Sequence, residues 1–143
     1  MVTINPYLSF NGNAEEAFNF YKSVFGGEFV SIVRFKETPE AGKVSKAEED
    51  KIMHIALPIG NGTILMASDV LESMGYKLVN GTNYSLTVSV DSEEEATILF
   101  NKLSAGGQVN MSLQKTFWGA FFGMLKDKFG VQWMISHSQN QQY

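Results

Sequence analysis

The sequence predicts an α+β protein made of two consecutive βαβββ modules. The main observation is an internal repeat: residues 13–17 (Asn-Ala-Glu-Glu-Ala) and 92–96 (Ser-Glu-Glu-Glu-Ala) superpose at a shift of 79 residues. Each copy follows a strand-like segment, opens a helix-like segment that ends at a Gly pair, and precedes three further strand-like segments. Acidic helix starts are common, because carboxylates suit the positive end of the helix dipole. Repetition of the whole order of elements is much harder to obtain by chance.

Length and composition agree with one ordinary globular domain. The chain has 143 residues, 44% of them hydrophobic and 18% charged, which is enough for a packed core. A net charge of −4 without a Lys/Arg cluster argues against nucleic-acid binding, and the lack of Cys excludes disulfides and thiolate chemistry. The N-terminus does not resemble a secretion signal, and no segment approaches the roughly 18 apolar residues of a membrane span. We therefore expect a cytoplasmic protein without a membrane partner.

The first module is expected over residues 3–69. Alternating apolar and polar side chains indicate strands, which we expect at residues 4–11, 28–35, 51–59 and 63–67. A hairpin turn at Asn61-Gly62 joins the last two strands. Residues 36–51 contain almost no large apolar side chain, so we expect a mobile, solvated loop there.

A helix near residues 14–25 follows the first strand. Its apolar side chains recur at the helical spacing i, i+3, i+4, i+7. Asn13 and Glu16 have the spacing of a capping box, in which each side chain reaches the backbone N–H of the other. Gly26 ends the helix, because glycine adopts the left-handed conformation without steric cost.

The second module is expected over residues 83–137, after a linker at 70–82. Ser92, with Glu95 three residues later, should cap a helix near 92–103. Strands are expected at residues 83–90, 108–114, 117–126 and 131–137. In the strand 117–126 both faces are apolar, which predicts burial on both sides and allows one face to line a pocket.

Several stretches of the chain resemble a known family. They are residues 7–17, 20–27, 65–69, 118–119 and 127–133, together with His54. They are similar to the PhnB-like proteins, often labelled 3-demethylubiquinone methyltransferase-like, within the vicinal-oxygen-chelate superfamily of glyoxalase I, extradiol dioxygenases and bleomycin-resistance proteins. The resemblance implies a curved eight-stranded mixed sheet that forms a trough for a small molecule, with the helices outside. It also implies a homodimer.

The superfamily further implies a divalent metal, held by His and Glu side chains on the first and fourth strands of each module. In this sequence those positions fall on Asn5, Pro6 or Tyr7, on Leu65 or Met66, on Tyr84 or Ser85, and on Met134. None of them carries an imidazole, carboxylate or thiolate donor. No Gly-rich loop follows a strand in a Rossmann-type context either. We therefore expect neither a metal nor another cofactor.

His54 is the candidate catalytic residue. In the strand 51–59 it is expected to share a face with Ile52 and Ala56, where it could act as a hydrogen-bond donor or a general base. A structural histidine is the alternative. The candidate ligand-binding residues are Tyr7, Ser9, Ser68, Asp69, Trp118, Phe122 and Met134.

Other roles are open for some of these residues. Ser68 and Asp69 can simply stop a strand and cap the element that follows. The aromatic side chains can pack a core. Asp127 precedes Gly130 in a segment that favours a tight turn over acid–base chemistry.

Three functions remain open on the sequence alone. The first is a metal-independent small-molecule-binding protein for an apolar or aromatic ligand. The second is a lyase, isomerase or dioxygenase-type enzyme with a non-standard site around His54. The third is a scaffold that uses the fold without a ligand.

Overall fold

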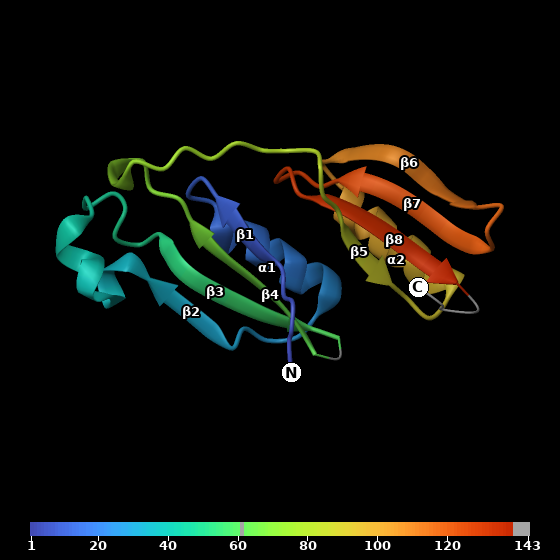
Figure 1. Ribbon diagram of the computed structural model, residues 1–143, viewed down its shortest axis with the longest axis horizontal. Coiled ribbons are helices and arrows are strands. Elements are labelled where there is room, and N and C mark those ends of the chain that lie inside the picture. Colours follow the sequence, from blue (N-terminus) through green and yellow to red (C-terminus); the bar gives the residue numbers. More distant parts are fainter. Residues whose placement is uncertain (61, 139–143) are drawn as a thin grey trace. The chain divides into compact units, whose positions relative to one another are not determined.

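The computed structural model describes residues 1–60 and 62–138, and it confirms two tandem βαβββ modules (Figure 1). The first contains β1 (Tyr7–Phe10), α1 (Ala14–Phe25), β2 (Ser31–Arg34), β3 (Ile52–Ile59) and β4 (Thr63–Asp69). The second contains β5 (Leu86–Ser89), α2 (Glu93–Ser104), β6 (Gln108–Lys115), β7 (Ala120–Lys126) and β8 (Gln132–Ser138). Both helices therefore lie where the apolar periodicity predicts them.

Each module forms a mixed four-stranded sheet. The strand orders are β1-β4-β3-β2 and β5-β8-β7-β6, and in each sheet the first pair is parallel and the others are antiparallel. The chain divides into two compact units, one up to Val79 and one from Asn80 onward. The joining of both sheets into one trough stays a prediction. Among the described residues no helix is long and apolar enough to cross a membrane.

In the first module, α1 covers one face of the sheet (Figure 1). The buried residues of α1 recur at helical spacing and are Ala14, Ala17, Phe18, Tyr21 and Val24. Along β4, buried side chains alternate with partly exposed ones, so that Met66 and Ser68 lie on the side away from α1. We call this side of the first sheet its helix-distal face.

A residue distant in sequence caps the start of α1. Asp69 is only 5% exposed. Its Oδ1 accepts the N–H of Ala14 at 2.9 Å, and its Oδ2 accepts the N–H of Ile52 at 2.8 Å. Asn13 occupies the N-cap position, but its side chain makes no capping hydrogen bond, so the predicted capping box with Glu16 is wrong. A buried carboxylate suits the helix N-terminus through both its hydrogen bond and its charge.

The register of β3 against β2 shifts close to this carboxylate. Val33 lies opposite His54, whereas the next residue, Arg34, lies opposite Ile52. Met53 is therefore an extra residue of the β-bulge type. Ile52 is 1% exposed and sends its N–H to Asp69, so the predicted shared face with His54 is wrong.

Some strands are shorter than the alternation predicts. β1 begins only at Tyr7, and β2 and β5 have four residues each. Ahead of β1, the side chain of Asn5 accepts the N–H of Ile64, and the carbonyl of Pro6 accepts the N–H of Met66. β4 in turn extends to Asp69, beyond the predicted end.

The segment between β2 and β3 is largely exposed, but it is not an irregular loop. It contains two 3-10 helices, η1 (Phe35–Glu37) and η2 (Pro39–Lys43). The carboxylate of Glu48 accepts the hydroxyls of Ser73 and Ser45, and these hydrogen bonds hold the pKa of Glu48 below its ordinary value. Local polar contacts therefore order a segment that lacks a core of its own.

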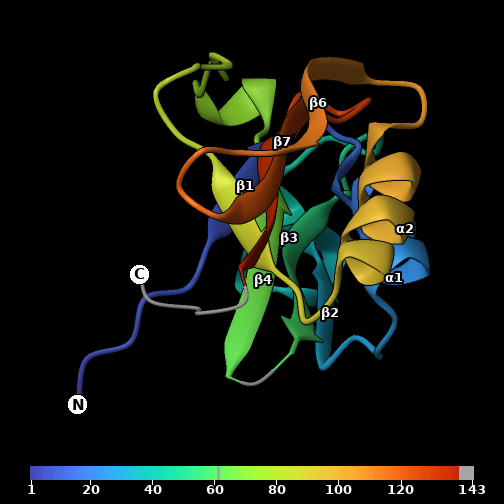
Figure 2. The same cartoon turned by 90° about the vertical axis from the view of Figure 1, so that its right-hand side faces the viewer.

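In the second module, α2 covers one face of the sheet (Figure 2). The predicted cap is confirmed, since Ser92 Oγ accepts the N–H of Glu95 at 3.0 Å. The helix approaches the sheet closely at Gly123 on β7. A Cβ added there would lie 2.7 Å from a ring carbon of Phe100. Only glycine leaves room for this contact.

The predicted strand 117–126 begins three residues too early. Thr116 Oγ1 donates to the carbonyl of Ala120 and accepts its N–H, and Gly119 has a positive φ of 88°. These contacts form a turn before β7. Phe117 and Trp118 lie in this turn and are 97% and 58% exposed, so neither belongs to a buried strand face.

The predicted turn around Asp127 is confirmed. Its Oδ1 accepts the N–H groups of Phe129 and Val131, and its Oδ2 accepts the indole N–H of Trp133 at 2.8 Å. The carboxylate is 3% exposed. Asp127 therefore stabilises the turn between β7 and β8.

Replacing Asp69 by Asn should destabilise the protein by about 1–3 kcal/mol, because an amide cannot accept both buried N–H groups and one donor loses its partner. The free energy of unfolding in urea measures the effect. Asp50→Asn, a change of the same chemistry at an exposed position, should leave the midpoint nearly unchanged. Equal effects of the two substitutions would contradict the capping role.

Gly123→Ala should also destabilise, by about 1–3 kcal/mol, because the added methyl group overlaps the ring of Phe100 and forces helix and sheet apart. Gly42→Ala is the matched control, since a Cβ there meets nothing within 4 Å. Thermal unfolding of both variants provides the comparison. A Gly123→Ala protein as stable as the parent would show that α2 does not pack this closely.

Candidate functional site

Three of the sequence-predicted site residues meet on the helix-distal face of the first sheet. Tyr7 lies on β1, Ser68 on β4 and His54 on β3, which are adjacent strands in the order β1-β4-β3. The hydroxyl of Tyr7 lies 2.8 Å from Ser68 Oγ and 3.2 Å from His54 Nδ1. The rings of Tyr7 and His54 are stacked, with their centroids 5.8 Å apart. We call these residues the Tyr7–His54–Ser68 cluster.

The sheet register brings these side chains together. Ser9 pairs with Ser68 across β1 and β4, so Tyr7 lies two residues away on the same face. Ile55 pairs with Ala67, and continuing this antiparallel register puts His54 opposite Ser68. Side chains on one face of adjacent strands are close enough for direct contact. Ser9 shares this face at the edge of the sheet and is exposed.

The Tyr7 hydroxyl has one proton and two neighbours, so the cluster has two hydrogen-bond arrangements. If Tyr7 donates to Ser68, then His54 Nδ1 donates to the phenol oxygen, and His54 Nε2 carries a lone pair. If Tyr7 donates to Nδ1, the neutral ring carries its proton on Nε2. In the described part of the chain Nε2 makes no hydrogen bond with the protein. The imidazole can therefore present either an acceptor or a donor.

The surroundings of the cluster on this face are mainly apolar. Ala56 is 3% exposed, and Val33, Ile64 and Met66 are partly buried. Asp69, the remaining candidate of this module, is turned to the opposite face, where its carboxylate caps α1. The helix-distal face therefore combines one polar cluster with an apolar surface.

An ion pair ties β2 to α1 in the first module. Arg34 donates to both carboxylate oxygens of Glu15, at 3.0 and 2.7 Å. These hydrogen bonds are the largest cause of a lowered pKa of Glu15 and a raised pKa of Arg34. Both side chains remain partly exposed. This bidentate pair ties the end of β2 to α1 and neutralises the charge of Arg34.

The candidates of the second module form a separate group. Trp118 contacts Phe122 edge-on, with ring centroids 6.0 Å apart. Met134 lies on β8, on the same sheet face as Phe122, and its sulfur accepts the hydroxyl of Thr87 at 3.6 Å. This group is apolar and partly exposed.

The four positions at which the superfamily holds its metal do not fit a divalent ion. Tyr7 pairs with Met66 in the first sheet, and Thr87 pairs with Met134 in the second. The sequence predicted Tyr84 or Ser85 in place of Thr87, because it began the strand too early. Phenol, hydroxyl and thioether groups are poor ligands for divalent ions. No group of three or more His, Asp or Glu residues within 1–60 and 62–138 could hold a metal ion.

Comparison with known proteins identifies the family of this chain. A family model described as 3-demethylubiquinone-9 3-methyltransferase matches residues 2–136. The crystal structure of protein PA1353 from Pseudomonas aeruginosa is similar at 42% identity, with a TM-score of 0.86, and the match covers 96% of this chain and 98% of that one. A PhnB protein from Bacillus cereus, described as a putative 3-demethylubiquinone-9 3-methyltransferase, is 33% identical over 96% of this chain and 100% of its own, with a TM-score of 0.77.

A more distant structure shows the fold alone. A glyoxalase-related enzyme from Fulvimarina pelagi is 22% identical, with a TM-score of 0.62, over 96% of this chain and 89% of that one. The chain therefore belongs to the PhnB-like 3-demethylubiquinone-9 3-methyltransferase family.

Proposed function

We propose that this protein binds a small molecule without a metal, on the helix-distal face of the first sheet, through the Tyr7–His54–Ser68 cluster. The observation that carries the proposal is the Tyr7 hydroxyl, which joins His54 and Ser68 at 3.2 and 2.8 Å. These contacts hold the imidazole in place and leave its Nε2 available to a ligand. A histidine held by a second side chain is a common way to position a binding group.

The surroundings of the cluster suggest the class of ligand. A largely apolar surface with a few convergent polar groups is typical of small-molecule sites. A ligand with an apolar or aromatic body and one hydroxyl or carbonyl group would match this face. Its body would cover Val33 and Met66, and its polar group would bond to His54 Nε2. Ser9 offers a further hydroxyl at the edge of β1.

The donor set supports a metal-independent site. The groups at the inherited metal positions are weak ligands for divalent ions, so binding would depend on hydrogen bonds and apolar contact. The second module could supply further contacts without a metal. Its aromatic and thioether contacts to an apolar molecule would come from Trp118, Phe122 and Met134. We include them as secondary candidates.

A thermal-shift screen against a metabolite library, run with and without divalent metal ions, tests the proposal. A bound ligand should raise the melting temperature by mass action, and the rise should not depend on metal. A rise that requires metal, or about one bound ion per chain in elemental analysis, would contradict it. A screen without any stabilising compound would favour the scaffold alternative, and turnover of a stabilising compound would favour the enzyme alternative.

Tyr7→Phe sharpens this test, because it removes the bridging hydroxyl and keeps the ring. Affinity for a compound found in the screen should fall about tenfold, as expected for the loss of one to two hydrogen bonds. Tyr76→Phe is the matched control in the same module, since Tyr76 is 65% exposed and far from the cluster in sequence. Calorimetric titration of both variants gives the comparison, and equal affinities would exclude the cluster.

We also propose that the protein forms a two-fold symmetric homodimer. Open edge strands support this, because β6 is exposed along most of its length and presents Val109 and Met111, which are 46% and 37% exposed. The interface should bury more than about 1,000 Å². Light scattering at micromolar concentration measures the assembly. A mass of one chain that stays constant on concentration would contradict the dimer.

A further inference from the structure

The distances within the Tyr7–His54–Ser68 cluster distinguish its two hydrogen-bond arrangements. The Tyr7 hydroxyl lies 2.8 Å from Ser68 Oγ and 3.2 Å from His54 Nδ1. A hydrogen bond between two hydroxyl oxygens usually spans about 2.5–3.0 Å, whereas one donated by an N–H group to an oxygen extends to about 3.2 Å. The phenol proton therefore lies on the shorter contact, to Ser68, and Nδ1 donates its own proton to the phenol oxygen.

This arrangement makes Ser68 responsible for the state of the imidazole. With the proton on Nδ1, Nε2 of the neutral ring keeps its lone pair and is a hydrogen-bond acceptor. In the described part of the chain Nε2 makes no hydrogen bond with the protein. Without the Ser68 oxygen, the phenol would donate to Nδ1, because a basic ring nitrogen is a strong acceptor. The ring proton would then lie on Nε2, and the ligand would meet a donor instead.

The fold does not require this chain of hydrogen bonds. In the second module the strand registers put Phe122 at the place of His54, and a phenyl ring cannot take part. Thr87 stands at the place of Tyr7, and its hydroxyl donates to the sulfur of Met134 at 3.6 Å. The same type of sheet therefore forms without the chain, which favours a role in binding for the cluster of the first module.

The strands of the first sheet bring no counter-charge to this face. Their only Asp, Glu, Lys or Arg residues are Arg34 and Asp69. Arg34 donates to Glu15 on α1, and Asp69 accepts the N–H of Ala14. A cation at Nε2 would lose its hydration without gaining a carboxylate, and an anion would meet a lone pair. The polar group that fits Nε2 is therefore an uncharged hydrogen-bond donor.

We propose that Ser68 sets the tautomer of His54 and thereby selects an uncharged hydroxyl, that of an alcohol or a phenol, as the polar group of the ligand. The ligand hydroxyl donates to His54 Nε2, and its alkyl or aryl body covers the apolar surface beside it. This inference rests on the proposed function and narrows it, because a carbonyl group, which can only accept, does not match a lone pair.

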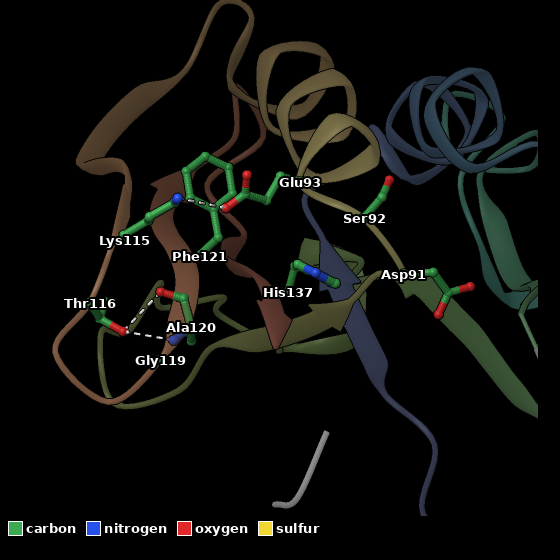
Figure 3. A pocket seen from close by; sticks show the side chains of 9 residues that line it. All are labelled: Asp91, Ser92, Glu93, Lys115, Thr116, Gly119, Ala120, Phe121 and His137. Atoms are coloured by element: carbon green, nitrogen blue, oxygen red, sulfur yellow. Dashed lines mark hydrogen bonds and ion pairs between the residues drawn. The ribbon is translucent and has the colours of Figure 1, made fainter. Parts of the chain in front are cut away.

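His137 provides an internal reference for the tautomer of His54. It lines a cavity of about 480 Å³ in the second module, beside the first turn of α2 (Figure 3). Its Nδ1 lies 2.9 Å from the carbonyl oxygen of Val90. Since a carbonyl can only accept, Nδ1 of His137 carries the proton whatever residue stands at position 68. The two histidines should therefore share one tautomer in the parent chain.

Long-range proton–nitrogen NMR of the full chain measures both tautomers without any ligand, under mildly alkaline conditions in which histidine side chains are generally neutral. His54→Gln assigns the signals of the two rings. The parent should show a protonated Nδ1 on both. Ser68→Ala should move the ring proton of His54 to Nε2 and leave His137 unchanged.

Ser9→Ala is the matched control, because it removes a neighbouring exposed hydroxyl from the same face of the sheet. It should leave both rings unchanged. A protonated Nε2 on His54 in the parent would overturn the proposal. The same His54 tautomer in the parent and in Ser68→Ala would overturn it as well.

Two probes of equal shape test the ligand class, 4-methylphenol and its methyl ether, by two-dimensional amide NMR. The phenol should cause saturable shifts around residues 7, 54, 66 and 68, and the ether should bind about tenfold more weakly, as for the loss of one hydrogen bond. In Ser68→Ala this preference should disappear, because Nε2 then donates and either oxygen can accept.

The outcomes separate this inference from the proposed function. Equal affinities of the two probes for the parent, or an unchanged preference in Ser68→Ala, would overturn the ligand class and leave the cluster as a binding site. An absence of saturable shifts with both probes would overturn the ligand class together with the site.

Discussion

The first module depends on one buried carboxylate. Asp69 ends β4 and accepts one N–H from the start of α1 and one from the start of β3. A buried carboxylate is costly unless its oxygens are hydrogen-bonded, so both contacts must form together. They fix α1 over the sheet and turn Ile52 to the helix side. The extra residue Met53 then places His54 on the helix-distal face, beside Tyr7 and Ser68.

The second module supports its helix and strand starts with different residues and different contacts. Ser92 caps its helix, Thr116 satisfies Ala120, and Asp127 holds the turn before β8. The buried carboxylate of the first module thus lies at the end of the fourth strand, and that of the second module lies in the turn before the fourth strand. The strand registers place His137 at the position equivalent to Asp69, where its Nδ1 bonds to the carbonyl of Val90 and its ring lines a cavity. Repeated modules need the same backbone groups satisfied, but they do not need the same side chain to do so.

The chemistry that we propose for this chain follows from the residues at the positions where the family resemblance places metal ligands. Tyr7 and Met66 lie side by side on the first sheet, where a metal protein would carry ligands. A phenol beside a thioether favours contact with an organic molecule over a divalent ion. A site built on hydrogen bonds, as we propose, agrees with the general rule that function depends on the site rather than on the fold.

The order of the elements was determined by the sequence alone, because periodicity, helix caps and glycines act over a few residues. The repeat at 13–17 and 92–96 predicted both modules, and the candidate list already contained Tyr7, His54 and Ser68. Their contact could not be derived, because Tyr7 and His54 are 47 residues apart and meet only through the register of β4 between them. The cap of α1 by Asp69 and the bulge at Met53 were likewise decided by tertiary structure. Asp69 accepts the N–H of Ala14, a residue 55 positions away in another element, and local patterns carry no record of such partners.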